Sequence, residues 1–144
     1  MKLVPVLATL LTMAVVVTAD GVPTKVTYVS HDTVSTTMAK GGSIIDDKGL
    51  VVLAQRRKAG EVEVHAKTNH VFIIVEGEAT FVTGGTLVGA RQTGPDQTRA
   101  ASVQGGETHH LTKGDVVTIP AKTPHWFKEV PTDTIAYYAI NTEP

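Results

Sequence analysis

Histidine is the residue type in this chain best suited to chemistry, since its 144 residues include six histidines and no cysteine. His65 ends a stretch of alternating glutamate and valine that also contains Glu63. Alternate residues of a β-strand face the same side, so we expect Glu63 and His65 on one face. Four residues separate His65 from His70, and a turn or bulge there would let the two imidazoles meet across adjacent strands. His125 lies much further along the chain, at the start of another predicted strand.

This combination of side chains predicts a divalent metal ion as their partner. Three imidazoles and a carboxylate inside a small β-domain would be costly unless they were paired or bound to a metal. First-row transition metals accept such ligands. We therefore expect one divalent ion (Fe, Mn, Ni, Cu or Zn) held by His65, His70, His125 and Glu63. Glu63 has two other interpretations, as a general base beside the metal or as a solvated strand residue.

Aromatic side chains are expected to complete a pocket around this ion. Phe72 and Phe127 share the strand faces of the neighbouring histidines and would line an apolar cavity. Tyr137 and Tyr138 face opposite sides of one strand, so only one of them can reach that cavity. The sequence contains no nucleophile-elbow or P-loop motif that would indicate another chemistry.

Charge and composition exclude several classes of protein. The chain has 13 Lys and Arg against 14 Asp and Glu, which gives a formal net charge of −1. This balance lacks the basic excess that is typical of nucleic-acid binding, so we expect no nucleic-acid partner. The absence of cysteine excludes disulfides, thiolate metal sites and a cysteine nucleophile.

Residues 1–19 have the pattern of a secretory signal peptide. A single lysine is followed by an almost unbroken apolar run, and Ala19 is a small residue at the expected cleavage site. Cleavage there would release residues 20–144 as a secreted or periplasmic protein with no membrane anchor. The alternative is a leader that stays attached to the chain as a membrane anchor.

The mature chain is predicted to be all-β apart from one short N-terminal helix within residues 32–42. Asp32 is expected to cap this helix and Gly41 to end it. Many short apolar runs between glycine and proline residues are typical of a sandwich or barrel of the jelly-roll kind. The predicted strands cover residues 26–29, 50–57, 61–65, 71–75, 79–83, 116–119, 125–130 and 135–140.

Two parts of this pattern lead to more detailed expectations. Residues 71–75 are continuously apolar, which predicts a strand buried on both faces. The turn at Glu76–Gly77 predicts that residues 79–83 are the hairpin partner of this strand. The segment 84–106 is long and rich in glycine, threonine and glutamine. It is expected to form a lid, an extra hairpin, an arm of a dimer or a solvated loop.

Two stretches of the sequence resemble the core motifs of the cupin superfamily. Residues 60–77 resemble the first motif. Residues 114–129 resemble the second, in which a glycine, a proline and the pair Pro124–His125 stand at the family's spacing. The resemblance implies a jelly-roll barrel, or double-stranded β-helix, formed by residues 20–144 as a single domain. The segment between the motifs, residues 78–113, is long for the family, which favours an extra hairpin or arm there.

The resemblance also implies a metal site. Family members commonly carry two histidines one residue apart and then a glutamate in the first motif, and a further histidine in the second. His65 and His125 match histidine positions, whereas Glu63 stands where the first histidine would be and His70 where the glutamate would be. The usual three histidines and one glutamate are therefore present with two positions exchanged. The exchange leaves two interpretations: a rearranged metal site of the same composition, or a site that binds no metal.

Two functions are consistent with these features. The first is a secreted, metal-dependent enzyme acting on a small molecule, for which the family implies dioxygenase, isomerase, lyase or decarboxylase chemistry. The second is a non-catalytic module that binds a small molecule or a structural metal, which the exchange of the two motif positions favours. We expect a small-molecule substrate if the protein is an enzyme. We expect a small-molecule ligand if it is a binding module, unless that module binds only a structural metal. The long inter-motif segment favours a homodimer, and so does the resemblance to the cupin superfamily, whose members commonly form dimers.

Overall fold

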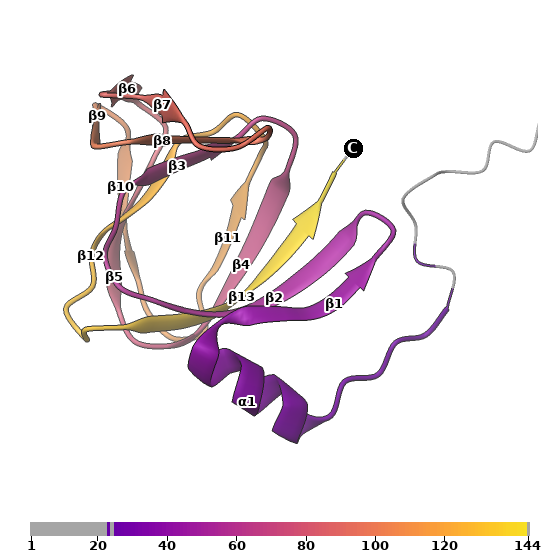
Figure 1. The fold of residues 1–144 in the computed structure, drawn as a ribbon. Helices are drawn as coiled ribbons and strands as arrows, with labels where there is room; N and C mark the ends of the chain where they lie inside the picture. The colour runs from indigo at the N-terminus through magenta and orange to yellow at the C-terminus, as the bar shows by residue number, and fades with distance from the viewer. Residues whose placement is uncertain (1–22, 24, 144) are drawn as a thin grey trace, which may run out of the picture.

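The computed structural model describes residue 23 and residues 25–143. The signal peptide predicted over residues 1–19 lies outside this range. The described chain forms one helix and thirteen strands (Figure 1). The elements are α1 (His31–Lys40), β1 (Gly42–Asp47), β2 (Leu50–Arg57), β3 (Val62–His65), β4 (Asn69–Glu76), β5 (Ala79–Thr83), β6 (Thr86–Val88), β7 (Arg91–Gln92), β8 (Gln97–Ala100), β9 (Ser102–Gln104), β10 (Glu107–Leu111), β11 (Val116–Ile119), β12 (His125–Glu129) and β13 (Ile135–Thr142).

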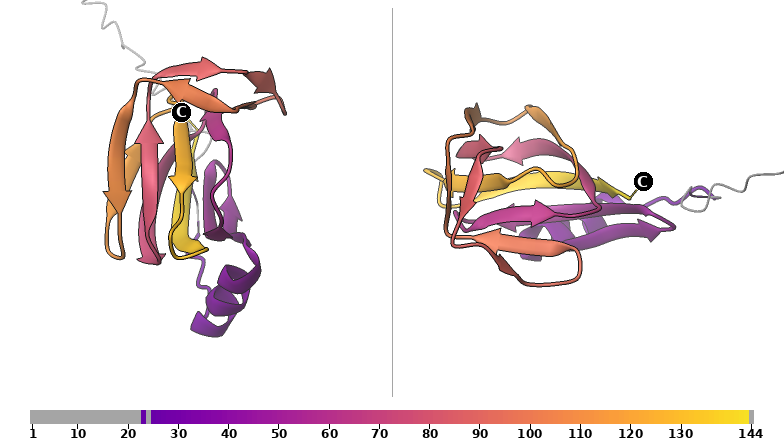
Figure 2. Two further views of the ribbon diagram at one scale, coloured as in Figure 1. Left: turned by 90° about the vertical axis from the view of Figure 1, so that its left-hand side faces the viewer. Right: turned by 90° about the horizontal axis from the view of Figure 1, so that it is seen from above.

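Most of the strands belong to two antiparallel sheets that face each other (Figures 1 and 2). The five-stranded sheet has the order β1-β2-β13-β4-β11, and the six-stranded sheet has the order β10-β5-β12-β3-β8-β7. The short strands β6 and β9 form a separate pair. The predicted all-β class and jelly-roll arrangement are therefore confirmed, with one difference: the described strands form two open sheets and do not close into a continuous barrel.

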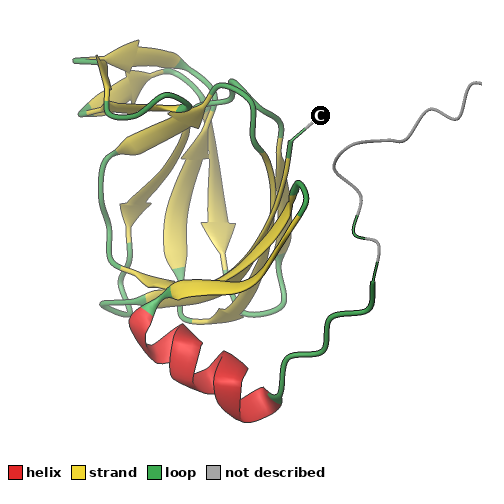
Figure 3. Cartoon of the chain, turned by 45° about the vertical axis from the view of Figure 1, so that its right-hand side comes forward, coloured by secondary structure: helices red, strands yellow, loops and turns green. Residues whose placement is uncertain are grey.

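The helix packs against β1 and β2 at one end of the five-stranded sheet (Figure 3). Its buried side chain is Met38, which contacts β2 and β13. Gly41 ends the helix as predicted, but the cap at its start is Ser30, whose Oγ accepts a hydrogen bond from a first-turn amide. Asp32, the predicted cap, instead lies in the first turn, where its charge complements the positive end of the helix. Among the described residues there is no helix of the length and apolar character that a membrane crossing requires.

The prediction for the first strand is wrong. Residues 26–29 form no strand, and Val26 and Tyr28 are 96% and 86% exposed. The first strand is instead β1, which forms a hairpin with β2 through Lys48 and Gly49. Strand formation depends on packing against a neighbouring strand more than on local preference. The hairpin gives β1 such a neighbour, whereas residues 26–29 have none.

The predictions for the strand around residues 71–75 and for its partner are also wrong. Along β4, His70, Phe72 and Ile74 are buried toward the opposite sheet, while the residues between them are only partly buried. This alternation is expected of an antiparallel sheet with one face on the core. The following strand, β5, pairs with β10 and β12 in the opposite sheet rather than with β4. The chain therefore crosses from one sheet to the other at Gly77.

The segment 84–106 forms short strands, which corresponds to the extra hairpin among the four expected forms. β6 pairs with β9, and β7 pairs with β8. β8 also extends the six-stranded sheet beside β3, where Arg99 stands opposite Glu63 and Gln97 stands opposite His65. The insertion thus places its own side chains next to the first motif.

Aromatic rings fill the space between the two sheets. The ring centroids of Phe72 and Tyr137 are 4.7 Å apart, as are those of Phe81 and Phe127. These four residues come from β4, β13, β5 and β12, and all four are buried. β4 also carries His70 and β12 carries His125. The aromatic core therefore fixes the positions from which these two histidines project.

Replacing Gly77 with alanine is expected to destabilise this fold. Gly77 has a φ of 86°, and an added Cβ would meet the backbone oxygen of Thr134 and lie 3.1 Å from Cα of Ile135. Backbone atoms at the start of β13 cannot move aside cheaply, so we expect the free energy of unfolding to fall by about 1–3 kcal/mol. Urea denaturation would measure the loss. Gly60→Ala is the control, because nothing lies within 4 Å of its added Cβ; equal stability of the two variants would contradict the prediction.

Candidate metal centre

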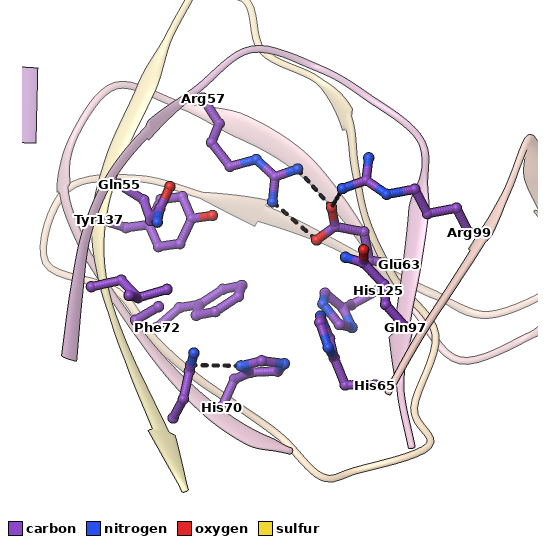
Figure 4. Close-up of a pocket in the computed structure, with 13 residues that line it drawn as sticks. Gln55, Arg57, Glu63, His65, His70, Phe72, Gln97, Arg99, His125 and Tyr137 are labelled. Carbon is purple, nitrogen blue, oxygen red and sulfur yellow. Dashed lines mark hydrogen bonds and ion pairs between the residues drawn. The ribbon is translucent and has the colours of Figure 1, made fainter. Parts of the chain in front are cut away.

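Three histidines from the two sheets meet in the space between them. His65 ends β3 and His125 begins β12, two paired strands of the six-stranded sheet, and His70 lies on β4 of the facing sheet. One nitrogen of each ring lies within 4.8 Å of a nitrogen of each of the other two rings. The ring centroids are between 4.8 Å and 5.8 Å apart. Figure 4 shows the three rings bordering one cavity.

This cavity has a volume of about 230 Å³ and is lined by residues of both sheets (Figure 4). One part of its lining is apolar and consists of Leu53, Phe72 and Ala139. The other lining residues are Gln55, Arg57, Glu63, His65, His70, Gln97, Arg99, His125, Tyr137 and Asn141. The site therefore combines the histidines with a hydrophobic wall and with charged and amide side chains.

The hydrogen bond of His70 determines which of its nitrogens can bind a metal. Nδ1 lies 2.7 Å from Oδ1 of Asn141, an oxygen that can only accept. The ring proton is therefore on Nδ1, and Nε2 carries a lone pair. Nε2 is buried and has no hydrogen-bond partner among the described residues. An unsatisfied buried polar atom costs about 1–3 kcal/mol, and a metal ion at Nε2 would remove this cost.

The other two histidines are oriented in the same way. Nδ1 of His125 lies 3.0 Å from the carbonyl oxygen of Thr123, and Nδ1 of His65 lies 3.4 Å from Oδ2 of Asp96. Histidines that bind metals typically donate their second ring N–H to a carbonyl or a carboxylate, which fixes the tautomer and the ring orientation. All three rings therefore have the arrangement of metal ligands that bind through Nε2.

Burial keeps the imidazoles of His70 and His125 uncharged. It lowers the pKa of His70, against the opposing effect of the hydrogen bond to Asn141. Burial also lowers the pKa of His125 to about 4, and the hydrogen bond to Thr123 only partly offsets it. Metal binding requires the neutral form of imidazole, so these two rings are ready to bind at neutral pH.

Glu63 lies outside the cluster of three histidines, with its carboxylate held by two arginines. Arg57 donates from Nη1 and Nη2 to the two carboxylate oxygens at 3.0 and 2.8 Å, and Nη2 of Arg99 lies 2.8 Å from Oε1. Burial by itself would raise the pKa of Glu63, but the two guanidinium groups outweigh it and lower the pKa to about 2. The structure therefore brings three of the four predicted ligands together and leaves the fourth paired with arginines.

The aromatic residues expected around the pocket differ in their positions. Phe72 lines the cavity, whereas Phe127 is not a lining residue. Phe127 is stacked behind Phe72 at a centroid distance of 6.1 Å, because it lies two residues further along β12 than the histidine and so deeper in the core. Of the two tyrosines, Tyr137 lines the cavity, while Tyr138 packs on the side of α1.

The residues that support the histidines and Glu63 were not predicted from the sequence. Asn141 is opposite His70 on the neighbouring strand, yet it lies 71 positions away along the chain. Asp96 and Arg99 belong to the inter-motif insertion, whose unusual length was the one available signal. Arg57 ends β2, and nothing in its local sequence distinguishes it from a solvated strand residue.

A scan against protein-family models and a search of curated proteins find no match for this chain. Its fold is similar to solved structures. BH2720 from Bacillus halodurans matches with a TM-score of 0.58 and 18% identity, over 81% of each chain. A Klebsiella pneumoniae protein with a double-stranded β-helix domain matches with a TM-score of 0.50 and 14% identity, over 71% of this chain and 74% of that one. The Fe(II) form of HppE matches with a TM-score of 0.51 and 16% identity, over 70% of this chain and 48% of its own.

Glu63→Gln is expected to lower the free energy of unfolding by about 2 kcal/mol, between the values typical of exposed and of buried ion pairs. The amide would leave two neighbouring guanidinium groups without a counter-charge. Glu61→Gln is the matched control, because it disrupts a similar two-bond ion pair with Arg91 at the surface. The side chain of Glu61 is 39% exposed and that of Arg91 is 53% exposed. The control should lose less stability than Glu63→Gln, because solvent screens the exposed pair of Arg91 and Glu61. Equal losses in urea denaturation at neutral pH would contradict this account of Glu63.

Proposed function

We propose that this chain, which has the double-stranded β-helix fold of the cupin superfamily, binds one divalent transition metal ion through His65, His70 and His125. The observation that carries the proposal is that Nδ1 of each ring lies against an oxygen acceptor, which leaves Nε2 of each ring to bind. Nε2 of His70 is buried without a partner among the described residues, which a metal would explain. The Fe(II) form of HppE, a neighbour in fold, supports a first-row metal in this architecture.

The proposed metal serves a small molecule in the adjoining cavity. Three protein ligands leave coordination positions open, and the cavity extends from the histidines toward Arg57 and Arg99 (Figure 4). When bound, the metal would supply Lewis-acid polarisation of an oxygen or, if it is redox-active, dioxygen chemistry. The residues of the chain hold the imidazoles in one orientation, and Leu53 and Phe72 keep one wall of the cavity apolar.

The state of Glu63 favours a second candidate, a non-catalytic module that binds a small molecule or a structural metal. Glu63 is the one carboxylate among the described lining residues, and it is held by arginines with its pKa at about 2. A group of that pKa is a weak base at neutral pH. An enzyme of the dioxygenase, isomerase or lyase type would therefore take its chemistry from the metal. Turnover of a small molecule by the metal-loaded protein, abolished in His125→Ala, would decide for the enzyme.

The metal proposal predicts a stoichiometric ion that depends on the cavity histidines. The full chain, purified without a polyhistidine tag, should contain one equivalent of metal by inductively coupled plasma mass spectrometry. His125→Ala should weaken the affinity by more than about a hundredfold, a larger loss than that of a supporting residue. Chelation should also lower the melting temperature of the wild type, since a ligand of the folded state stabilises it.

The control for this experiment is His110→Ala. His110 lies on β10 with a side chain that is 62% exposed, next to Glu78. This variant should keep both its metal and its response to the chelator. A wild type whose melting temperature responds to neither metal nor chelator would contradict the proposed metal site.

We also propose that the chain is exported and that residues 1–19 are removed. Expression of the full chain in a bacterial host should yield a protein in the periplasm or medium that begins at Asp20 by mass spectrometry. Ala19→Arg should block cleavage, because the peptidase requires a small residue there. Full-length protein that keeps residues 1–19 in the membrane fraction would contradict their removal, and protein found only in the cytoplasm would contradict export.

We further propose that the mature protein is a homodimer. Sedimentation of the mature protein in the analytical ultracentrifuge would test this, and a monomer mass would contradict it.

A further inference from the structure

The lining of the cavity carries an excess of positive charge. Its charged members are the guanidinium groups of Arg57 and Arg99 and the carboxylate of Glu63, which leaves one positive charge uncompensated. A divalent ion on the histidines would add two more charges. Asp96, which lies behind His65, offsets only one of them. A ligand that enters this space is therefore stabilised if it is an anion.

Arg99 is the donor group that such an anion can use. Both terminal nitrogens of Arg57 are engaged by Glu63. Among the described residues, the guanidinium of Arg99 has a single ion pair, from Nη2 to Oε1 of Glu63 at 2.8 Å. A guanidinium is planar and has five N–H donors in a fixed fork, which matches the two oxygens of a carboxylate. The amide of Gln97 also lines the cavity, and its Oε1 already accepts from Thr93, so its NH₂ group is a further donor.

The size and the apolar wall of the cavity restrict the anion further. A volume of about 230 Å³ is below the range of about 300–1,000 Å³ of pockets for drug-sized ligands. Leu53, Phe72 and Ala139 present hydrocarbon surface to the ligand, which an inorganic anion cannot cover. One fork with free donors matches a carboxylate better than a phosphate, whose third oxygen and second charge would lack a partner.

We propose that the cavity binds a small organic acid, with its carboxylate on Arg99 and Gln97 and its body over Phe72 toward the three histidines. The part of this inference that concerns the end near the histidines rests on the proposed metal. Figure 4 shows Arg99 and His70 on opposite sides of the cavity, whose volume of about 230 Å³ suits a molecule of a few carbon atoms. Arg99 is thereby the residue that selects ligands by charge.

Titration calorimetry of the metal-loaded full chain tests this assignment. The probes are malonate and succinate, with malonamide and succinamide as neutral molecules of the same shape and inorganic phosphate as a second anion. We expect the acids to bind at least about tenfold more tightly than the amides, because hydrogen bonds to charged groups are the stronger ones. Tighter binding of phosphate than of both acids would overturn the carboxylate assignment, and so would equal binding of acids and amides.

Variants of two neighbouring arginines locate the binding. Arg99→Gln should weaken binding of the better acid by about tenfold or more. Arg99→Lys, which keeps the charge but loses the fork, should fall between it and the wild type. Arg91→Gln is the matched control, because Arg91 pairs with Glu61 outside the cavity and should leave the affinity unchanged. Circular dichroism and urea denaturation would establish that each variant is folded, and equal affinities of Arg99→Gln and Arg91→Gln would overturn the proposal.

Metal content measured before and after each titration separates this inference from the proposed function. If the protein holds its metal but binds neither acid, the organic-acid inference fails and the metal site stands. If the wild type takes up no metal, the same titration on the metal-free chain still decides the role of Arg99. Binding that depends on Arg99 there would support the acid site, and binding that does not would overturn it.

Discussion

The convergence of three imidazole rings on one cavity is the interaction on which the rest of this site depends. Such a cluster is stable only if every ring nitrogen has a use, because buried polar atoms without partners are costly. The protein meets this condition for the Nδ1 atoms, with Asn141, Thr123 and Asp96 as acceptors. One nitrogen of each ring also lies within 4.8 Å of a nitrogen of the other two. This convergence gives the cavity its capacity to hold a metal ion.

The electrostatic character of the cavity depends on an element outside the two motifs. β8 extends the six-stranded sheet and supplies Arg99 and Gln97, while the turn before it supplies Asp96. Asp96 also accepts hydrogen bonds from the backbone of Lys67 and the hydroxyl of Thr68, and so it holds the connection between β3 and β4 in place. The insertion therefore sets both the charge of the cavity and the position of one histidine.

Much of the fold follows from the sequence, and the errors about strands share one main cause. Local signals mark β2 and the strands of the two motifs, mostly as apolar runs or apolar alternation. Turn residues mark the end of the helix at Gly41 and the turn at Gly77. The false strand at residues 26–29, the missed β1 and the wrong partner of β5 were errors about pairing. Pairing depends on which segment lies alongside, and a local pattern does not contain that information.

The candidate site divides in the same way. The sequence by itself determined the residue types, their placement on strand faces and the presence of three histidines at motif spacing. Only the tertiary structure decided that Glu63 belongs to Arg57 and Arg99 rather than to the histidines. It also decided that Asn141, 71 positions away, orients His70. The physical reason is that an ionised carboxylate pairs with the charges nearest to it in space. Those neighbours are set by the packing of two sheets, which joins residues far apart in the chain.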